Sequence, residues 1–271
     1  ADQHRYAIRL EAAVAKVFCS EHTIRFIRDA QTIFGGMGYE TADSKQARGE
    51  AAFGIEQLVR DAEMYRIGEG ATDILRPFVV REGLSPHLDR AKRSYAEDLS
   101  ILEQGREALK LLRFYLPWYL RQWRKGPLPD GRELAHPQAR PAVRYVERTS
   151  RRLAREILYA MVRFQTAFRD EQRLQNKIEA VSEDLFAMLA TVLYAERQAR
   201  LDGHTTVWEL AEAFCATATQ RIEQRLREFR HHRDATAATT GKQALKGDYP
   251  TLSEGIIRRR LEDYRRNQHM T

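Results

Sequence analysis

Apolar side chains recur along this chain at the three- and four-residue spacing of amphipathic helices. The pattern predicts helices over residues 3–33, 54–66, 72–82, 88–124, 142–200 and, from Thr206, through Phe229. No pair of segments alternates between apolar and polar positions as two paired strands would. The sequence therefore predicts an all-α protein, and several long helices favour up-and-down bundle packing.

Glycine and proline mark the expected breaks between these helices. We expect irregular segments over 34–39, 40–52 (with a short helix), 68–70, 126–141 and 234–255, and a short basic helix over 256–267. Pro117 should kink or split the helix around it, because proline lacks the amide donor that a helix interior needs. Ser85-Pro86 predicts a boundary, so we expect a helical bundle over residues 1–84 and a second helical domain over 85–271.

The composition of the 271 residues is that of a globular protein, with 43% hydrophobic and 31% charged residues. No apolar run approaches the roughly 20 residues that span a bilayer, and the N-terminus has no apolar signal segment. Cys19 and Cys215 each lie in an apolar helical pattern, which predicts two buried thiols rather than a disulfide.

The net charge of +7 is unevenly distributed. Residues 1–83 carry 11 basic and 13 acidic side chains, whereas residues 84–271 carry 34 and 25. Solvated helix faces explain such an excess as well as an anionic partner does. The arginines between residues 140 and 155 could contact phosphates, but no base-reading motif accompanies them, so we expect no nucleic-acid partner.

Two histidine patterns have spacings that could supply metal ligands. Glu133 and His136 have Glu-x-x-His spacing, but a di-iron bundle needs a second such motif. His231-His232 is an isolated pair. We therefore expect no metal site.

One stretch, residues 60–76, carries the clearest candidate chemistry. Glu69 stands between Gly68 and Gly70, and an apolar helical pattern lies on each side. Two glycines remove side-chain bulk around one carboxylate, which suits a positioned general base. The alternative is a helix-ending glycine beside a solvated glutamate.

A second motif, Gln31-Thr-Ile-Phe-Gly35-Gly36-Met-Gly-Tyr, precedes this stretch. Together the two motifs resemble the C-terminal end of the acyl-CoA dehydrogenase flavoproteins, and the resemblance covers about residues 5–83. The long helical region after residue 85 resembles the extension of the very-long-chain branch of that family. The family fold ends in a four-helix domain, of which only the later helices are present here.

The resemblance implies a role for each motif. Family members oxidise an acyl-CoA thioester to the trans-2-enoyl-CoA, and Glu69 matches the base that removes the α-proton. Gln31, Gly35 and Gly36 match positions that contact FAD, usually from the partner subunit of a homodimer. Positions that match further FAD contacts are Ala71, Thr72 and Asp73. Gly68 and Gly70 match positions lining the acyl site.

The chain also departs from the family pattern. Gly68 stands where an aromatic side chain is usual, which would enlarge the acyl site, and Ala71 stands where threonine is usual. Most of the family's flavin site lies on a β-domain that is absent here, so we expect this chain alone to be inactive. The implied electron acceptor is an electron-transfer flavoprotein, and the implied location is cytoplasmic, or in a eukaryote the mitochondrial matrix and inner membrane.

Residues 109–125 hold five basic residues, five aromatic residues and no acid. That composition suits a helix lying in a membrane interface, near where the very-long-chain branch binds membranes. A core helix whose basic side chains reach out to water explains it equally well. The alternative to an enzyme fragment is thus a non-catalytic helical module for dimerisation or membrane attachment.

Overall fold

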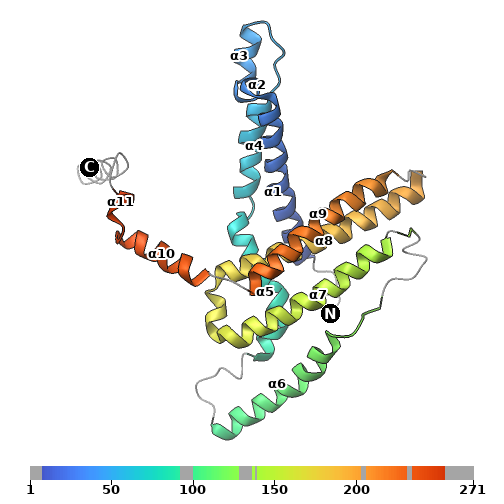
Figure 1. The fold of residues 1–271 in the computed structure, drawn as a ribbon, viewed down its shortest axis with the longest axis vertical. Helices are drawn as coiled ribbons and strands as arrows, with labels where there is room; N and C mark the ends of the chain where they lie inside the picture. The colour runs from blue at the N-terminus through green and yellow to red at the C-terminus, as the bar shows by residue number, and fades with distance from the viewer. Residues whose placement is uncertain are drawn as a thin grey trace. The chain divides into compact units, whose positions relative to one another are not determined.

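The computed structural model describes residues 8–91, 100–127, 136–137, 139–202, 206–230 and 234–253 (Figure 1). All regular elements in these ranges are helical, which confirms the all-α prediction. The contacts divide the chain into two compact units, residues 1–227 and 228–271.

The first unit begins with a helical hairpin. α1 (Arg9–Phe34) runs out, the short helices α2 (Gly36–Tyr39) and α3 (Ala42–Ala47) turn the chain, and α4 (Ile55–Ile67) runs back beside α1 (Figure 1). Lys45 fixes the turn, since its buried ammonium donates to the carbonyls of Met37 at 2.7 Å and Phe53 at 2.6 Å.

α5 (Thr72–Ala91) follows α4 and contacts both α1 and α8. It passes through Ser85-Pro86 without a break, so the domain boundary expected there is not a break in the helix. The division at residue 84 remains a prediction from the sequence, and it differs from the division into compact units.

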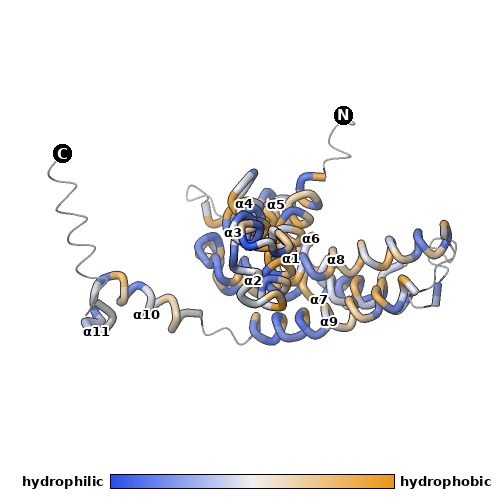
Figure 2. Tube along the Cα trace, turned by 90° about the horizontal axis from the view of Figure 1, so that it is seen from above, coloured by the Kyte–Doolittle hydropathy of each residue, from blue (hydrophilic) through white to orange (hydrophobic). Residues whose placement is uncertain are grey.

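The remaining helices of this unit are α6 (Ile101–Arg121), α7 (Ala139–Phe164), the 3₁₀ helix η3 (Gln165–Arg169), α8 (Gln172–Asp202) and all but the last three residues of α9 (Val207–Arg230). Figures 1 and 2 both draw α7, α8 and α9 side by side. Their buried faces share a core formed by Leu153, Val181, Leu185, Met188, Ala218, Ile222 and Leu226. At the other end Trp208 packs among small and branched residues of α7 and α8.

Several local predictions were wrong. The segment 234–255, expected to be irregular, contains α10 (Asp234–Lys246) and α11 (Pro250–Ser253), because alanine is a strong helix former even without an apolar stripe. The helix expected over 142–200 is interrupted by η3. Of the kink or split expected at Pro117, the split does not occur, because α6 runs through this residue. Both cysteines are free thiols, but neither is buried as expected: Cys19 is exposed and Cys215 is half-buried. The basic helix expected over 256–267 lies outside the described residues.

Candidate active site

The α4–α5 loop, residues 68–71, carries the predicted base. Gly68 ends α4, and its amide donates to the Met64 carbonyl at 2.7 Å. The Ala71 carbonyl accepts from the amides of Ile74 and Leu75, each at 2.9 Å, and so starts α5. Both ends of the loop are therefore fixed by helix hydrogen bonds.

Glu69 itself has an unusual backbone conformation. Its φ is +53°, and the φ of Gly70 is +97°. A non-glycine residue in the left-handed region costs about 1–2 kcal/mol, and such strain is concentrated at functional sites. The Glu69 side chain is exposed. A β-carbon at Gly70 would lie 3.0 Å from Leu75 Cδ2, so glycine is needed there for space as well as for conformation.

Lys16 was not singled out in the sequence, yet it supports this loop. Its Nζ, from the middle of α1, donates to the Gly70 carbonyl at 2.7 Å. The contact joins residues 54 positions apart, so no local pattern could predict it. Lys16 thereby holds the peptide between Gly70 and Ala71, one residue beyond Glu69.

Two more predicted residues begin α5. Asp73 is exposed in its first turn, where the helix dipole favours a negative charge. Thr72 is 4% exposed, and its hydroxyl oxygen has no hydrogen-bond partner among the described residues. A buried hydroxyl without a partner can still form a hydrogen bond with a ligand.

The other predicted motif lies at the far end of α1. The Gln31 amide donates to the Gly38 carbonyl at 3.3 Å, and Gly35 has a φ of +58°. Gly35 and Gly36 are exposed, and a β-carbon at either would meet nothing within 4 Å. Their backbone is therefore open to a ligand.

The structure does not bring the two motifs together within one chain. From Lys16, beside the Glu69 loop, to the end of α1 at Phe34 is about 27 Å at the rise of an α-helix. The predicted residues between 68 and 73 thus lie together in one place. A second surface, formed by Gln31, Gly35 and Gly36, is too far away in the same chain to belong to the same site.

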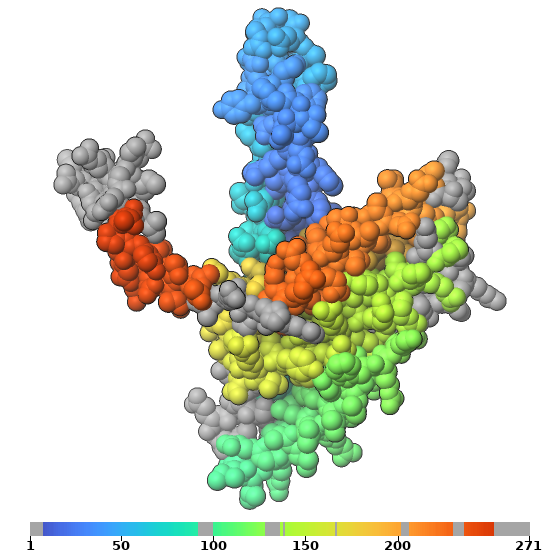
Figure 3. All heavy atoms as spheres, in the orientation of Figure 1, coloured from blue at the N-terminus to red at the C-terminus, as the bar shows by residue number. Residues whose placement is uncertain are grey.

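Large apolar side chains lie exposed along the hairpin. Those more than half exposed on α1 and α4 are Phe26, Ile33, Met64, Tyr65 and Ile67. On the face drawn in Figure 3, no other described helix covers the end of the hairpin that carries α2 and α3. Exposed apolar area of this kind marks a contact surface.

A buried charged cluster holds α5 against α8. Arg76, one turn into α5, lies 3.5 Å from a carboxylate oxygen of Glu179, which is fully buried. Burial and the neighbouring Glu183 raise the pKa of Glu179 to about 8. Burial likewise raises the pKa of Glu183 to about 6. Asp184 forms ion pairs with Arg221, at 2.6 Å, and with Arg225.

The helix that holds most of residues 109–125, α6, has no buried residue. Its leucines at 109, 112, 116 and 120 share one face, and each is more than half exposed. Trp123 just beyond is 62% exposed, with the Arg155 guanidinium 4.0 Å from its ring centroid. Within the described residues no helix has the length and hydropathy needed to cross a bilayer.

The other candidate patterns are largely engaged in structure. In the arginine-rich helix α7, Arg152 pairs with Glu223 at 2.9 Å, while Arg144 and Arg155 donate to backbone carbonyls. His136 stacks on Trp208 with ring centroids 4.1 Å apart. Glu133 and His231-His232 lie outside the described residues. Among the residues that are described, no cluster of side chains could hold a metal ion.

Comparison with known proteins relates the chain to one family. Residues 1–84 match the family described as acyl-CoA dehydrogenase, C-terminal domain. A relative named "Probable acyl-CoA dehydrogenase FadE10" from Mycobacterium bovis is 35% identical over 265 residues, which is 95% of this chain and 40% of the relative. The human "Very long-chain specific acyl-CoA dehydrogenase, mitochondrial" is 25% identical over 264 residues, 95% of this chain and 37% of its own.

A solved structure agrees at the level of the fold. The crystal structure of an acyl-CoA dehydrogenase complexed with FAD from Bacillus anthracis matches with a TM-score of 0.53 and 24% identity. The match covers 81% of this chain and 32% of that one. The chain therefore spans about 40% of the length of the relatives it matches.

Proposed function

The chain belongs to the acyl-CoA dehydrogenase family, whose C-terminal domain its residues 1–84 match, and from this premise we propose that it is the C-terminal part of a flavin-dependent enzyme. The enzyme oxidises long-chain acyl-CoA to trans-2-enoyl-CoA in fatty-acid β-oxidation. The observation that carries the proposal is the α4–α5 loop, where Glu69 is held in a left-handed conformation between two glycines.

In this proposal Glu69 removes the α-proton of the acyl thioester. Gly68 and Gly70 add no side chain beside the carboxylate, so the thioester can approach it closely. The end of α4 fixes the loop before Glu69, and Lys16 and the start of α5 fix it after Glu69, which limits the positions that its carboxylate can take. The thioester and the remainder of the protein exclude water from Glu69, which makes the carboxylate a stronger base.

FAD, when bound, supplies the acceptor for the hydride that leaves the β-carbon. Ala71, Thr72 and Asp73 would lie against the FAD that serves the same active site. The free capacity of the Thr72 hydroxyl and the open backbone of the Gly35-Gly36 pair support contacts of this kind. An electron-transfer flavoprotein would be the partner protein that accepts the electrons.

Gln31, Gly35 and Gly36 would contact the FAD of the partner subunit in a homodimer. The roughly 27 Å between this motif and the Glu69 loop supports two separate cofactor contacts, because one chain cannot bring both motifs to one flavin ring. The exposed apolar side chains of α1 and α4 supply surface for such an assembly.

The isolated chain should be inactive, since it spans only about 40% of its relatives and leaves the hairpin uncovered. Purified chain mixed with FAD and passed through a desalting column should carry well below one flavin per chain, measured by absorbance. Retention of one flavin per chain would contradict this.

The base assignment is tested in the complete enzyme that contains this chain. Glu69→Gln should abolish thioester dehydrogenation while leaving bound flavin unchanged, because the amide keeps the shape of the side chain but cannot accept the proton. Glu82→Gln on α5 is the matched control and should retain activity. Full turnover by Glu69→Gln would remove Glu69 from the mechanism.

The second candidate function, membrane attachment, is favoured by the α6 leucine face. An exposed apolar stripe flanked by basic residues suits the interface of an anionic bilayer. Leu116→Asp and Trp123→Ala should reduce co-sedimentation with anionic liposomes, and Leu210→Asp on α9 should not. Binding that is absent in the parent, or unchanged in both α6 variants, would leave α6 without this role.

A further inference from the structure

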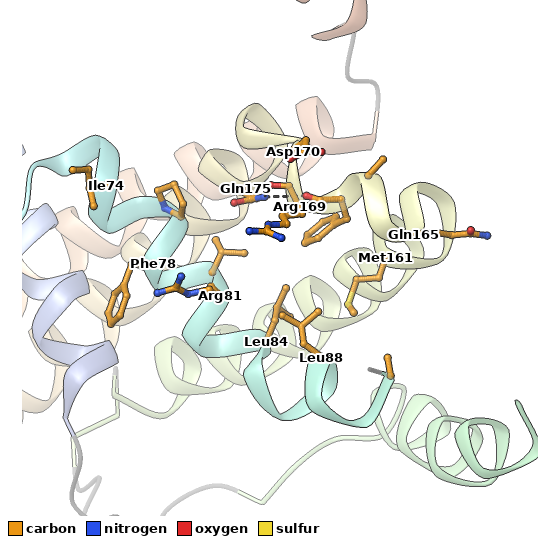
Figure 4. Close-up of a pocket in the computed structure, with 15 residues that line it drawn as sticks. Ile74, Phe78, Arg81, Leu84, Leu88, Met161, Gln165, Arg169, Asp170 and Gln175 are labelled. Carbon is orange, nitrogen blue, oxygen red and sulfur yellow. Dashed lines mark hydrogen bonds between the residues drawn. The ribbon is translucent and has the colours of Figure 1, made fainter. Parts of the chain in front are cut away.

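A groove lies between α5 and the turn that joins α7 to α8 through η3 (Figure 4). Its cavity volume is about 1110 Å³, and α5 lines it from Ile74 to Ala91. At the rise of an α-helix that wall is about 25 Å long. Known small-molecule sites typically enclose about 300–1,000 Å³, so the groove can take a long ligand. Glu69 does not line it, so the groove is separate from the candidate active site.

One end of the groove is apolar. Figure 4 shows Leu84 and Leu88 of α5 close together, with Met161 of α7 facing them. Phe168 and Leu84 form buried walls, while Leu88 remains 40% exposed. A methionine side chain adapts its shape to a bound alkyl group. A hydrocarbon chain that covered these walls would remove their apolar surface from water, which favours binding.

Positive charge lies beside this apolar end, near the middle of the α5 wall. Figure 4 shows the Arg169 guanidinium directed into the space between η3 and α5. The buried Gln175 amide holds η3 in place, since it donates to the carbonyls of Phe168 and Arg169, each at 2.9 Å. Arg81 lines the α5 side.

Neither Arg81 nor Arg169 forms an ion pair with a carboxylate in the part of the chain that the structure describes. Asp170 also lines the groove, so its ionised side chains sum to one positive charge. That charge complements a single monoanionic group better than a dianionic phosphate. A guanidinium binds a carboxylate through two parallel hydrogen bonds.

We propose that this groove is a binding site for one long-chain fatty carboxylate. The alkyl chain lies along Leu84, Leu88 and Met161, and the carboxylate meets Arg169 and Arg81. Each methylene withdrawn from water strengthens binding roughly fourfold. Affinity therefore depends on chain length as well as on the anionic head.

The test is a titration of the purified 271-residue chain with cis-parinaric acid, a fluorescent fatty acid, followed by competition. We expect saturation at one site per chain, displacement by palmitate, and at least tenfold weaker displacement by laurate and by hexadecanol. Binding of cis-parinaric acid that does not saturate would contradict a defined binding site. Equal displacement by palmitate and hexadecanol overturns the carboxylate part of the proposal, and displacement by palmitoyl-CoA without displacement by palmitate does the same.

Variants locate the site. Leu88→Arg and Met161→Trp obstruct the apolar end, and each should weaken palmitate binding at least tenfold. Arg169→Gln should weaken palmitate binding about tenfold and leave hexadecanol binding unchanged. Leu210→Arg and Arg173→Gln, both outside the groove, are the matched controls and should bind as the parent does. Circular dichroism verifies the fold, and if Leu88→Arg fails to fold, Met161→Trp decides; parental affinity in that variant overturns the proposal.

Discussion

Replacing Glu179 by glutamine should stabilise the folded chain, and more so as the pH rises. Glu179 is fully buried on α8, and neither of its carboxylate oxygens has a hydrogen-bond partner among the described residues. Arg76 on α5 and Arg225 on α9 favour its charge, whereas Glu183 on α8 and Glu21 on α1 oppose it. Burial is the largest effect. Together with the two glutamates it outweighs the two arginines and raises the pKa of Glu179 to about 8.

The magnitude follows from the two states of the chain. The unfolded chain releases the Glu179 proton near pH 4.5, and the folded chain holds it to about pH 8. The folded state therefore binds the extra proton in this window, and its stability falls by about 1.4 kcal/mol per pH unit. Glutamine resembles the protonated acid and does not titrate. The variant should match the parent near pH 4, exceed it by about 3 kcal/mol at pH 7, and exceed it by about 5 kcal/mol at pH 9.

The assay is urea unfolding followed by circular dichroism at several pH values between 4 and 9. With ordinary urea dependence, the midpoint of the variant at pH 9 should lie more than about 1 M above that of the parent. Glu212→Gln, an exposed glutamate of α9, is the control and should show a small difference at every pH. A difference between the Glu179 variant and the parent that is independent of pH, or a less stable variant at pH 9, would refute the reasoning.

Further predictions concern the loop and the helix ends, each measured by urea unfolding at neutral pH. Lys16→Met leaves the Gly70 carbonyl without its donor and should cost about 1–3 kcal/mol; no loss would mean that water replaces the ammonium. Gly70→Ala should cost more than about 1 kcal/mol, because φ is +97° and Leu75 is too close. Gly83→Ala, in open space within α5, should instead gain about 0.5–1 kcal/mol, and equal effects of the two alanines would contradict the strain argument. Ser100→Ala removes the capping box of α6 and should cost about 1 kcal/mol; unchanged stability would show that α6 contributes little.

Helices with an apolar stripe could be predicted from the sequence, and those formed for other reasons could not. α1 and α9 follow the spacing of their buried residues. The break at η3 contains no glycine or proline, and the apolar pattern continues through it. There the chain turns at Gln165, with a φ of +47°, and Phe168 is buried, so tertiary packing sets the break.

Some features of the candidate site could likewise be predicted from the sequence, and others could not. Glycine spacing and the family resemblance pointed to Glu69, but the left-handed φ at this residue could not be read from the sequence, since a glutamate gives no signal for it. Lys16 and Glu179 each act on α5 or the loop before it from distant parts of the sequence. Their roles depend on which helices pack together, and a hydrophobic pattern does not encode that choice of neighbour.

The cost of burying Glu179 points to its role in the fold. A buried polar cluster contributes little net stability, but a shift of one helix past another would separate Arg76 and Asp184 from their polar partners. Glu179 faces Arg76 on α5, while Asp184 on the same helix holds Arg221 and Arg225 of α9. The register of α5, and with it the loop that carries Glu69, is therefore tied to α8.

The apolar packing joins the same helices. Phe186 of α8 packs against a cluster formed by Ala13, Val14 and Val79 of α1 and α5. Residues 1–84 thus share a core with the region that follows them, even though the family match ends at residue 84. A fragment cut there would lose both this packing and the partner of Arg76. Packing therefore joins the helices on the two sides of residue 84, and the domain division there remains a prediction from the sequence.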